Sequence, residues 1–345
     1  MTAASAHEVV LRVGPVSALV RRRWIAGSAA LVLLVVALAL VSLCYGSDWI
    51  SPSGVARALA GSGDDVMVVR EWRLPRTLAA VLFGAALAVS GALLQTLTRN
   101  PLGSPDILGL DAGAFTGVLI AYVFADGAAS VAGGAIVGGL LAAGVMGVLA
   151  ARGGFRGGRL IVVGIAMNAI LTALDSWIVQ RTDHDVASAA SGWNAGSLNG
   201  VGMSDLALPA VIVAGCVVVL VPVAGAIQQS AMGDDVAAAT GVHLGRLRLV
   251  LLVVTVALTA TVTAVAGPIA FVALCAPQIG RRLVGASSVA LWPAALTGAA
   301  LLLLADIGAQ WLLAPQSLPV GVMTTSFGGC YLLWFLIREV RSGRR

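Results

Sequence analysis

The first long apolar run of the chain is RRRWIAGSAALVLLVVALALVSLC, at residues 21–44. Three arginines precede about 20 uncharged residues, which is the length that a helix needs to cross the hydrocarbon core of a bilayer. The run is longer than the apolar core of a signal peptide, and no A-x-A cleavage site follows it. We therefore expect an uncleaved first membrane-spanning helix.

The composition of the whole chain agrees with this local pattern. Of 345 residues, 59% are hydrophobic and 11% are charged, and the mean hydropathy is +0.97. Soluble domains carry roughly 25% charged residues, and surface-to-volume scaling limits how much apolar surface a soluble fold can bury. The composition therefore predicts an all-α membrane protein.

Nine further apolar segments give about ten transmembrane helices in total. They lie near 24–44, 75–97, 107–125, 130–151, 159–180, 205–226, 248–267, 270–284, 289–313 and 319–337. The eighth segment is short. No linker or charge block divides the chain, so we expect one transmembrane domain over 1–345, with tails at 1–23 and 338–345 flanking a bundle at 24–337.

The distribution of arginine predicts the orientation of these helices. With a cytoplasmic N-terminus and ten spans, sixteen of the 21 arginines lie in cytoplasmic segments and five in external ones. Basic residues favour the cytoplasmic side of a membrane. This asymmetry predicts that both termini are cytoplasmic.

All 21 basic residues are arginines, and this excludes several chemistries. A P-loop needs a lysine to reach the nucleotide phosphates, and Schiff-base enzymes need a lysine amine. The chain is therefore no P-loop ATPase, and any ATP-driven transport needs another polypeptide. The arginines lie at helix ends and not in one patch, so we expect no nucleic acid. The four cysteines show no Cys-x-x-Cys spacing, and we expect no metal site and no cofactor.

Small residues in the predicted fourth helix have a spacing that allows helices to approach closely. Gly134 and Gly138 form a Gly-x-x-x-Gly pair, which favours either a tight bundle or a seam between subunits. The alternative is that glycine is simply abundant in this chain.

Polar residues inside predicted spans are the first candidates for a functional site. Ionisable groups are expensive in a membrane and usually face the interior of a bundle. The candidates for pathway lining or packing are Gln95, Asn168, Asp175, Asp306 and Gln310. No basic residue is placed in the middle of a span to pair with either aspartate, and a proton relay remains the less favoured alternative to packing or pathway lining.

Two stretches between predicted spans are also informative. Residues 99–106 are polar and interrupted by prolines, which indicates a cytoplasmic turn. Residues 232–246 are typical of a short helix, with Asp234 or Asp235 able to cap its start and Gly241 placed at its end. Taken alone, this helix could be an ordinary connection or a lever that a partner pushes.

Eight short strings occur in order along nearly the whole chain. They are RLPRT at 73–77, GALLQT at 91–96, NPL at 100–102, PDILG at 105–109, AGPIAFV at 266–272, AP at 276–277, RRL at 281–283 and LPVGVMT at 318–324. Together they resemble the permease subunits of ABC importers for iron-siderophores, haem and vitamin B12 (FecCD-type). The stretch at 193–200, with 181–183 before it, is similar to the ferric enterobactin permease branch.

This resemblance implies a multi-pass permease of the inner membrane, surrounded by lipid and without enzymatic activity of its own. In such importers a second permease subunit completes the pathway, and in enterobactin-type systems it is a different chain. Two ABC ATPase subunits supply the energy, and an extracytoplasmic substrate-binding protein delivers the cargo. The cargo implied here is a ferric siderophore of the catecholate, enterobactin-like class.

The resemblance also implies roles for particular residues. Arg73 and Arg76 would lie on the external face and meet acidic residues of the binding protein. The segment from Asp234 to Leu244 would be the coupling helix that docks into the ATPase, and Asp234, Asp235, Ala238, Gly241 and Leu244 are its candidate contacts.

The sequence departs from the family pattern at several positions. Gln310 stands where many members have arginine, Gln278 replaces a common histidine, Cys330 replaces a common proline, and Asp111 is unusual. These departures are compatible with a heterodimer whose partner supplies the missing groups. A haem or cobalamin importer of the same family and a proton-coupled secondary transporter are alternative functions. An intramembrane enzyme is disfavoured because no nucleophile–base pair stands out.

Overall fold

The computed structural model describes residues 8–13, 16–46, 48–124, 128–151, 157–286, 288–314 and 317–342. Residues 1–7 and 343–345 of the two predicted tails lie outside this part of the chain. The last helix continues to Ser342, five residues beyond the predicted end of the bundle at 337.

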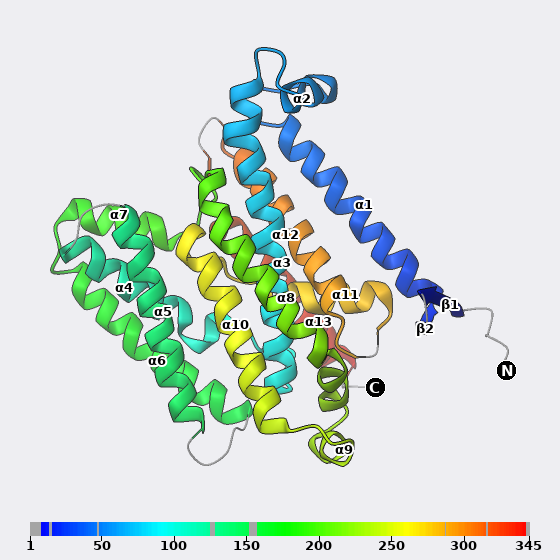
Figure 1. Ribbon diagram of the computed structural model, residues 1–345. Coiled ribbons are helices and arrows are strands. Elements are labelled where there is room, and N and C mark those ends of the chain that lie inside the picture. Colours follow the sequence, from blue (N-terminus) through cyan, green and yellow to red (C-terminus); the bar gives the residue numbers. More distant parts are fainter. Residues whose placement is uncertain are drawn as a thin grey trace.

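Helices dominate the described residues (Figure 1). In chain order the elements are β1 (Glu8–Val13), β2 (Val16–Arg21), α1 (Arg22–Cys44), α2 (Pro52–Leu59), the π-helix η1 (Val68–Arg73), α3 (Leu74–Thr98), the 3-10 helix η2 (Pro105–Leu108), α4 (Leu110–Phe124), α5 (Ala128–Ala151), α6 (Gly157–Val179), α7 (His184–Asn194), α8 (Met203–Ala231), α9 (Asp234–Ala239), α10 (Leu244–Ala266), α11 (Val272–Val284), α12 (Leu291–Trp311) and α13 (Val320–Ser342). Each of the ten predicted spans overlaps one α-helix of this series.

The helical membrane architecture is confirmed, whereas the crossing of ten spans stays a prediction. Among the described residues, seven helices are long and apolar enough to cross a bilayer. Helix α4 has 15 residues and α11 has 13. At 1.5 Å per residue these two helices extend about 22 and 20 Å, less than the roughly 30 Å of a hydrocarbon core.

Helix α3 is the central element of the bundle. It packs against α8, α10, α11 and α12, and Figure 1 shows it between α1 on one side and the α4–α6 group on the other. Phe83 and Leu93 are fully buried along it. A Cβ atom at Gly84 would collide with the backbone of Gly298 in α12, and one at Gly91 with the backbone of Ala273 in α11. Small residues therefore let three helices pack at backbone distance.

Close packing between α4 and α5 uses the predicted glycine pair. Cβ atoms at Gly134 and Gly138 would collide with the backbone of Gly117 and Gly113, respectively. The Gly-x-x-x-Gly spacing thus forms a contact inside this chain.

The N-terminal segment differs from the expected all-α fold. Strands β1 and β2 pair antiparallel, with Glu8 opposite Arg21 and Val13 opposite Val16. Helix α1 begins at Arg22, directly after β2. Both strands are rich in valine, a β-branched residue that favours strands.

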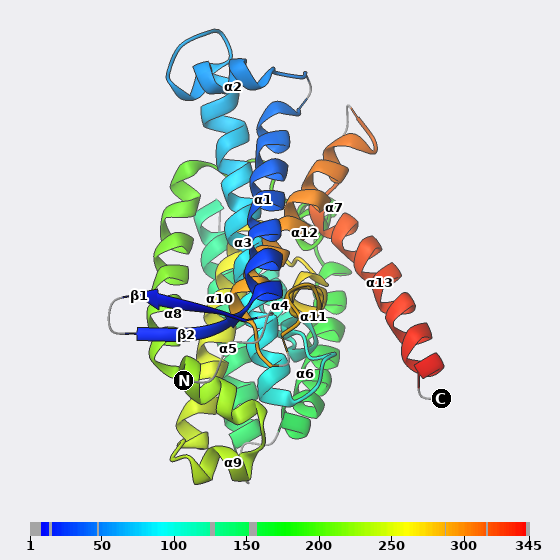
Figure 2. The same cartoon turned by 90° about the vertical axis from the view of Figure 1, so that its right-hand side faces the viewer.

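The two ends of the bundle carry different elements. Figures 1 and 2 show α2 at one end, and α9, the start of α1 and the end of α13 toward the other. We call these the α2 end and the α9 end. The start of α1 and the end of α13 therefore lie toward the same end of the bundle. That this end is cytoplasmic stays a prediction.

Candidate functional sites at the two ends of the bundle

Arg73 at the α2 end holds the C-terminus of α1. Its Nη1 donates to the carbonyl oxygens of Leu43 at 3.1 Å and Cys44 at 2.8 Å, and its Nη2 donates to that of Asp48 at 2.7 Å. The residue is only 8% exposed. Unpaired carbonyl groups at a helix C-terminus attract a cation, so Arg73 caps α1 from a neighbouring element.

Arg76 lies one helical turn further along and forms a buried ion pair. Its Nη2 is 2.8 Å from Oδ1 of Asp306 in α12, and its Nε donates to both carboxylate oxygens at 3.0 Å. The Asp306 side chain is fully buried. The expectation that no basic residue pairs with Asp306 is therefore wrong. Arg76 lies in the first turn of α3, where the sequence was read as a helix end, and the packing of α3 on α12 brings it to the aspartate.

Three further side chains extend this ion pair. Gln310 donates to Asp306 Oδ2 at 2.9 Å, and Arg76 Nη1 donates to Oδ1 of Asn199 at 2.5 Å. Asn199 in turn donates to Ser317 at 3.0 Å. We call these five residues the α2-end clasp; it connects α3, α12 and the segments that follow α7 and α12. Sequence reasoning missed Asn199 and Ser317, which lie outside the predicted spans.

The other polar candidates lie apart from the clasp. Asp175 in α6 is buried and accepts a hydrogen bond of 2.5 Å from Thr116 in α4. Asn168 lies at the middle of α6, where its backbone meets Gly109. Gln95 donates to the carbonyl of Leu274 at 3.0 Å. The five candidates therefore form several helix contacts and not one common site.

Two irregular segments meet inside the bundle. Asp106 Oδ2 accepts hydrogen bonds from Ser104 at 3.0 Å and from the backbone N–H of Phe271 at 3.3 Å. Phe271 has a φ of 68° and precedes the first turn of α11. The segment predicted as a cytoplasmic turn therefore re-enters the bundle, as the contact of Gly109 with the middle of α6 also indicates. Irregular backbone at membrane depth needs such internal partners.

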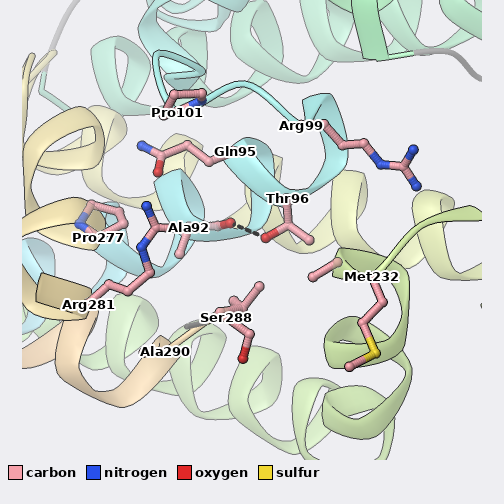
Figure 3. A pocket seen from close by; sticks show the side chains of 12 residues that line it. Ala92, Gln95, Thr96, Arg99, Pro101, Met232, Pro277, Arg281, Ser288 and Ala290 are labelled. Carbon is pink, nitrogen blue, oxygen red and sulfur yellow. Dashed lines mark hydrogen bonds between the residues drawn. The ribbon is translucent and has the colours of Figure 1, made fainter. Parts of the chain in front are cut away.

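The α9 end contains a cavity of about 610 Å³ between α3, α8, α11 and the start of α12. Figure 3 shows Gln95 and Arg281 on one side of it and Met232 on the other. Arg281 is exposed in the last turn of α11. Gln95, Arg99 and Arg281 give the cavity a polar and cationic lining, to which Met232 adds an apolar side chain. Sequence reasoning did not predict this cavity.

Helix α9 forms the outermost element next to this cavity (Figure 1). Ala237 is buried, whereas Asp235 and Ala238 are exposed. Val236 within the helix is 45% exposed, and Met232 before it is 75% exposed. Gly241 has a φ of 85° just after the helix, and Leu244 begins α10. The predicted short helix is present and presents an apolar surface.

Asp234 bonds to side chains of the bundle, although its own side chain is 42% exposed. It accepts hydrogen bonds from Arg99 at 2.6 Å and from Arg248 at 2.7 Å. It does not cap α9, since the N-cap residue is Gly233 and has no side chain to do so. Sequence reasoning missed both arginines, although each lies at the end of a predicted span, where a basic residue is ordinarily read as a topology signal.

Comparisons with known proteins agree with this architecture. The profile of the FecCD transport family matches residues 33–338. The chain is 44% identical to the ferric enterobactin transport system permease protein FepG of Escherichia coli (strain K12), with 90% of this chain and 97% of FepG covered.

Two other relatives are more distant. FepD, a ferric enterobactin transport system permease protein of the same strain, is 37% identical, with 93% of this chain and 97% of FepD covered. The vitamin B12 import system permease protein BtuC of Salmonella paratyphi A is 34% identical, with 92% of this chain and 96% of BtuC covered.

A solved structure extends the comparison to the fold. A metal-chelate type ABC transporter in an inward-facing conformation superposes with a TM-score of 0.80 at 27% identity, with 90% of this chain and 98% of that chain covered. The apolar helices, the family profile and this superposition agree along nearly the whole length. The chain is a multi-pass inner-membrane ABC importer permease and belongs to the FecCD transport family.

Proposed function

We propose that this chain is the permease subunit of an importer that moves a ferric catecholate siderophore of the enterobactin class across the inner membrane. The observation that carries the proposal is the 44% identity to FepG over 97% of that protein. Haem and cobalamin remain the alternative cargoes, and the 34% identity to BtuC supports cobalamin less strongly.

The energy would come from two separate ATPase subunits. A P-loop requires lysine, and this chain contains none. Helix α9 supports the proposal because it exposes Val236 and Asp235, and the exposed Met232 lies two residues before the helix. An amphipathic helix with such a face suits a groove on a partner protein. Asp235, Ala238, Gly241 and Leu244 are the proposed contacts or supports of this coupling helix.

The second permease subunit would be a different chain. FepG and FepD of one strain both match this chain, at 44% and 37% identity, and share one system name. This supports a heterodimeric permease pair around the pathway. The residues of the chain that line the pathway would come from the polar set of Gln95, Asn168, Asp175, Asp306 and Gln310.

A substrate-binding protein would dock at the α2 end, which we place outside the inner membrane. Arg73 and Arg76 remain the proposed docking residues, and both guanidinium groups already hold partners within this chain. A docking carboxylate would therefore have to share these arginines with their present partners. Charges at a rim affect orientation and association rate more than affinity.

Uptake of iron-radiolabelled ferric enterobactin tests the cargo. We expect a strain that lacks this chain to lose this uptake and to recover it when the chain is supplied with its partner subunits. Unchanged uptake in the deletion strain, or loss of cobalamin or haem uptake instead, would contradict the proposed cargo.

The energy source needs a separate measurement because Asp175 could suggest a proton-coupled carrier. We expect uptake to stop when the P-loop lysine of the partner ATPase is replaced, and to persist when the proton gradient is collapsed while ATP is maintained. The reverse result would favour secondary transport.

A further inference from the structure

Helix α3 connects the two ends of the bundle. It contains 25 residues, which corresponds to about 37 Å at 1.5 Å per residue, and this exceeds the roughly 30 Å of a hydrocarbon core. Its first turn carries Arg76 of the α2-end clasp, and Arg99 directly follows its last residue as the C-cap. This largely buried helix therefore reaches from one end of the bundle to the other.

The carboxylate of Asp234 connects α9 to this helix. Arg99 Nη2 is 2.6 Å from Oδ1 of Asp234, and Arg248 Nη2 is 2.7 Å from each carboxylate oxygen. We call Arg99, Asp234 and Arg248 the α9-end clasp. Asp234 is the first residue of α9, and Arg248 lies in the second turn of α10. One carboxylate therefore joins the ends of three helices.

The α9-end clasp strengthens the short connection between α9 and its neighbouring helices. Helix α9 has six residues and is bordered by Gly233 and Gly241, which have φ values of 131° and 85°. Glycine permits such backbone conformations and does not by itself fix the direction of a helix. Apart from the clasp, Thr240 donates to Gln229 at 3.3 Å. Among the described residues, the two arginines thus make shorter polar contacts between the α9 segment and the long helices than Thr240 does.

The exposure of the three side chains argues against a role in folding alone. The Arg99, Asp234 and Arg248 side chains are 50%, 42% and 24% exposed. Ion pairs of this exposure contribute little to stability because water and salt screen them. A planar guanidinium nevertheless fixes the direction of a carboxylate, so the geometry favours a role in orientation.

We propose that the α9-end clasp makes α9 move as one body with α3 and α10, so that displacement of α9 by the ATPase reaches the α2 end through α3. Arg99, Asp234 and Arg248 are positioning residues in this proposal, and Asp234 does not serve as an ATPase contact. The inference rests on the proposed function, in which α9 is the coupling helix.

The test uses the complete transporter in liposomes, with both permeases, the ATPase and the binding protein. The readout is the number of iron-radiolabelled ferric enterobactin molecules imported per ATP hydrolysed. We expect Asp234→Asn to lower this ratio at least about fivefold, the lower range for coupling between sites. We expect Asp234→Glu to keep most of the wild-type ratio because it retains the negative charge.

Arg248→Gln has a matched control in the same helix. Arg246 is exposed and makes no ion pair or side-chain hydrogen bond among the residues that the structure describes. We expect Arg248→Gln to lower the ratio and Arg246→Gln to leave it unchanged. Adding Arg248→Gln to Asp234→Asn has little further effect, since both changes disrupt the same clasp. A wild-type ratio in Asp234→Asn, or fully additive losses in the double variant, would overturn the proposal.

Two complications have defined readings. If Asp234→Asn does not assemble with its partners, Arg99→Gln and Arg248→Gln test the proposal instead, because each variant keeps one of the two ion pairs of the clasp. Wild-type transport ratios in both variants would overturn the proposal. If the wild-type transporter imports no ferric enterobactin, the proposed cargo is wrong. The role of the α9-end clasp is then tested with a measurement that needs no cargo. A fluorophore on Trp72→Cys, in a chain with Cys330→Ser, reports on the α2 end, where Trp72 is 61% exposed.

For this label we expect an ATP-dependent fluorescence change in the otherwise wild-type transporter. The change is lost with Asp234→Asn and retained with Arg246→Gln. A change that persists in Asp234→Asn would overturn the clasp for any cargo.

Discussion

Arg76 and Asp306 are 230 residues apart in sequence, and Arg76 Nε lies 3.0 Å from each carboxylate oxygen of the aspartate. The Asp306 side chain is fully buried, whereas that of Arg76 is 19% exposed. A buried carboxylate without its cation is costly. The pair therefore fixes α3 against α12 at the end of the bundle where we propose that the binding protein docks.

Removal of the arginine alone is expected to destabilise the fold strongly. Arg76→Gln leaves Asp306 buried without a cation and is expected to lower the free energy of unfolding by about 3 kcal/mol. Asp306→Asn in the same chain recovers part of this loss, because both charges are then absent. Unfolding of the detergent-solubilised single and double variants measures the interaction. Purely additive losses would contradict the buried pair.

Two substitutions of Arg73 separate its proposed roles in capping α1 and in docking the binding protein. Both Arg73→Gln and Arg73→Lys disrupt the hydrogen bonds to the end of α1, and we expect each to lower the free energy of unfolding by about 2 kcal/mol. If Arg73 also docks the binding protein, Arg73→Lys retains more affinity for it than Arg73→Gln, since the charge remains. Arg57→Gln, an exposed arginine of α2, is the stability control.

If wild-type stability remains in both Arg73 variants, the capping role is wrong. Equal affinity of Arg73→Lys and Arg73→Gln for the binding protein would contradict the proposed docking role and leave the cap intact.

Asp175 separates an ATP-driven from a proton-driven importer. Its carboxylate accepts a hydrogen bond from Thr116, and an asparagine side chain can accept the same bond. We therefore expect Asp175→Asn to keep uptake within about twofold of wild type, as for a neutral replacement within an intact hydrogen bond. Uptake measured across an imposed proton gradient checks this. Loss of uptake together with loss of its dependence on the gradient would support a proton relay.

The sequence predicted the long helices well because each consists of about 20 apolar residues. The run from Trp24 to Cys44 coincides with α1, and the segment at 75–97 coincides with α3. The eighth segment, at 270–284, is predicted to be short, and the corresponding α11 has 13 residues. Apolar composition reports burial in protein or lipid, but it does not show whether a short helix crosses the bilayer or begins within it.

The sites were less predictable because their partners are distant in sequence. Asp306 was identified as a costly intramembrane charge, but its pairing with Arg76 depends on the packing of α3 against α12. Asp234 was assigned to the coupling helix, but the contacts of its side chain required the relative positions of α3, α9 and α10. Residue type and spacing indicate that a charge needs a partner; tertiary packing selects which one.

The contact between α4 and α5 gives a prediction with a closely matched control. Gly134 meets the backbone of Gly117, whereas its neighbour Gly133 has no atom within 4 Å of a Cβ position. We expect Gly134→Val to lower the free energy of unfolding by about 2 kcal/mol, as in other overpacked contacts, because α4 and α5 have to separate. Gly133→Val adds an apolar side chain to an exposed position of the same helix and is expected to leave stability unchanged. Thermal unfolding of the two purified variants compares them directly, and equal stabilities would show that α4 and α5 do not pack through Gly134.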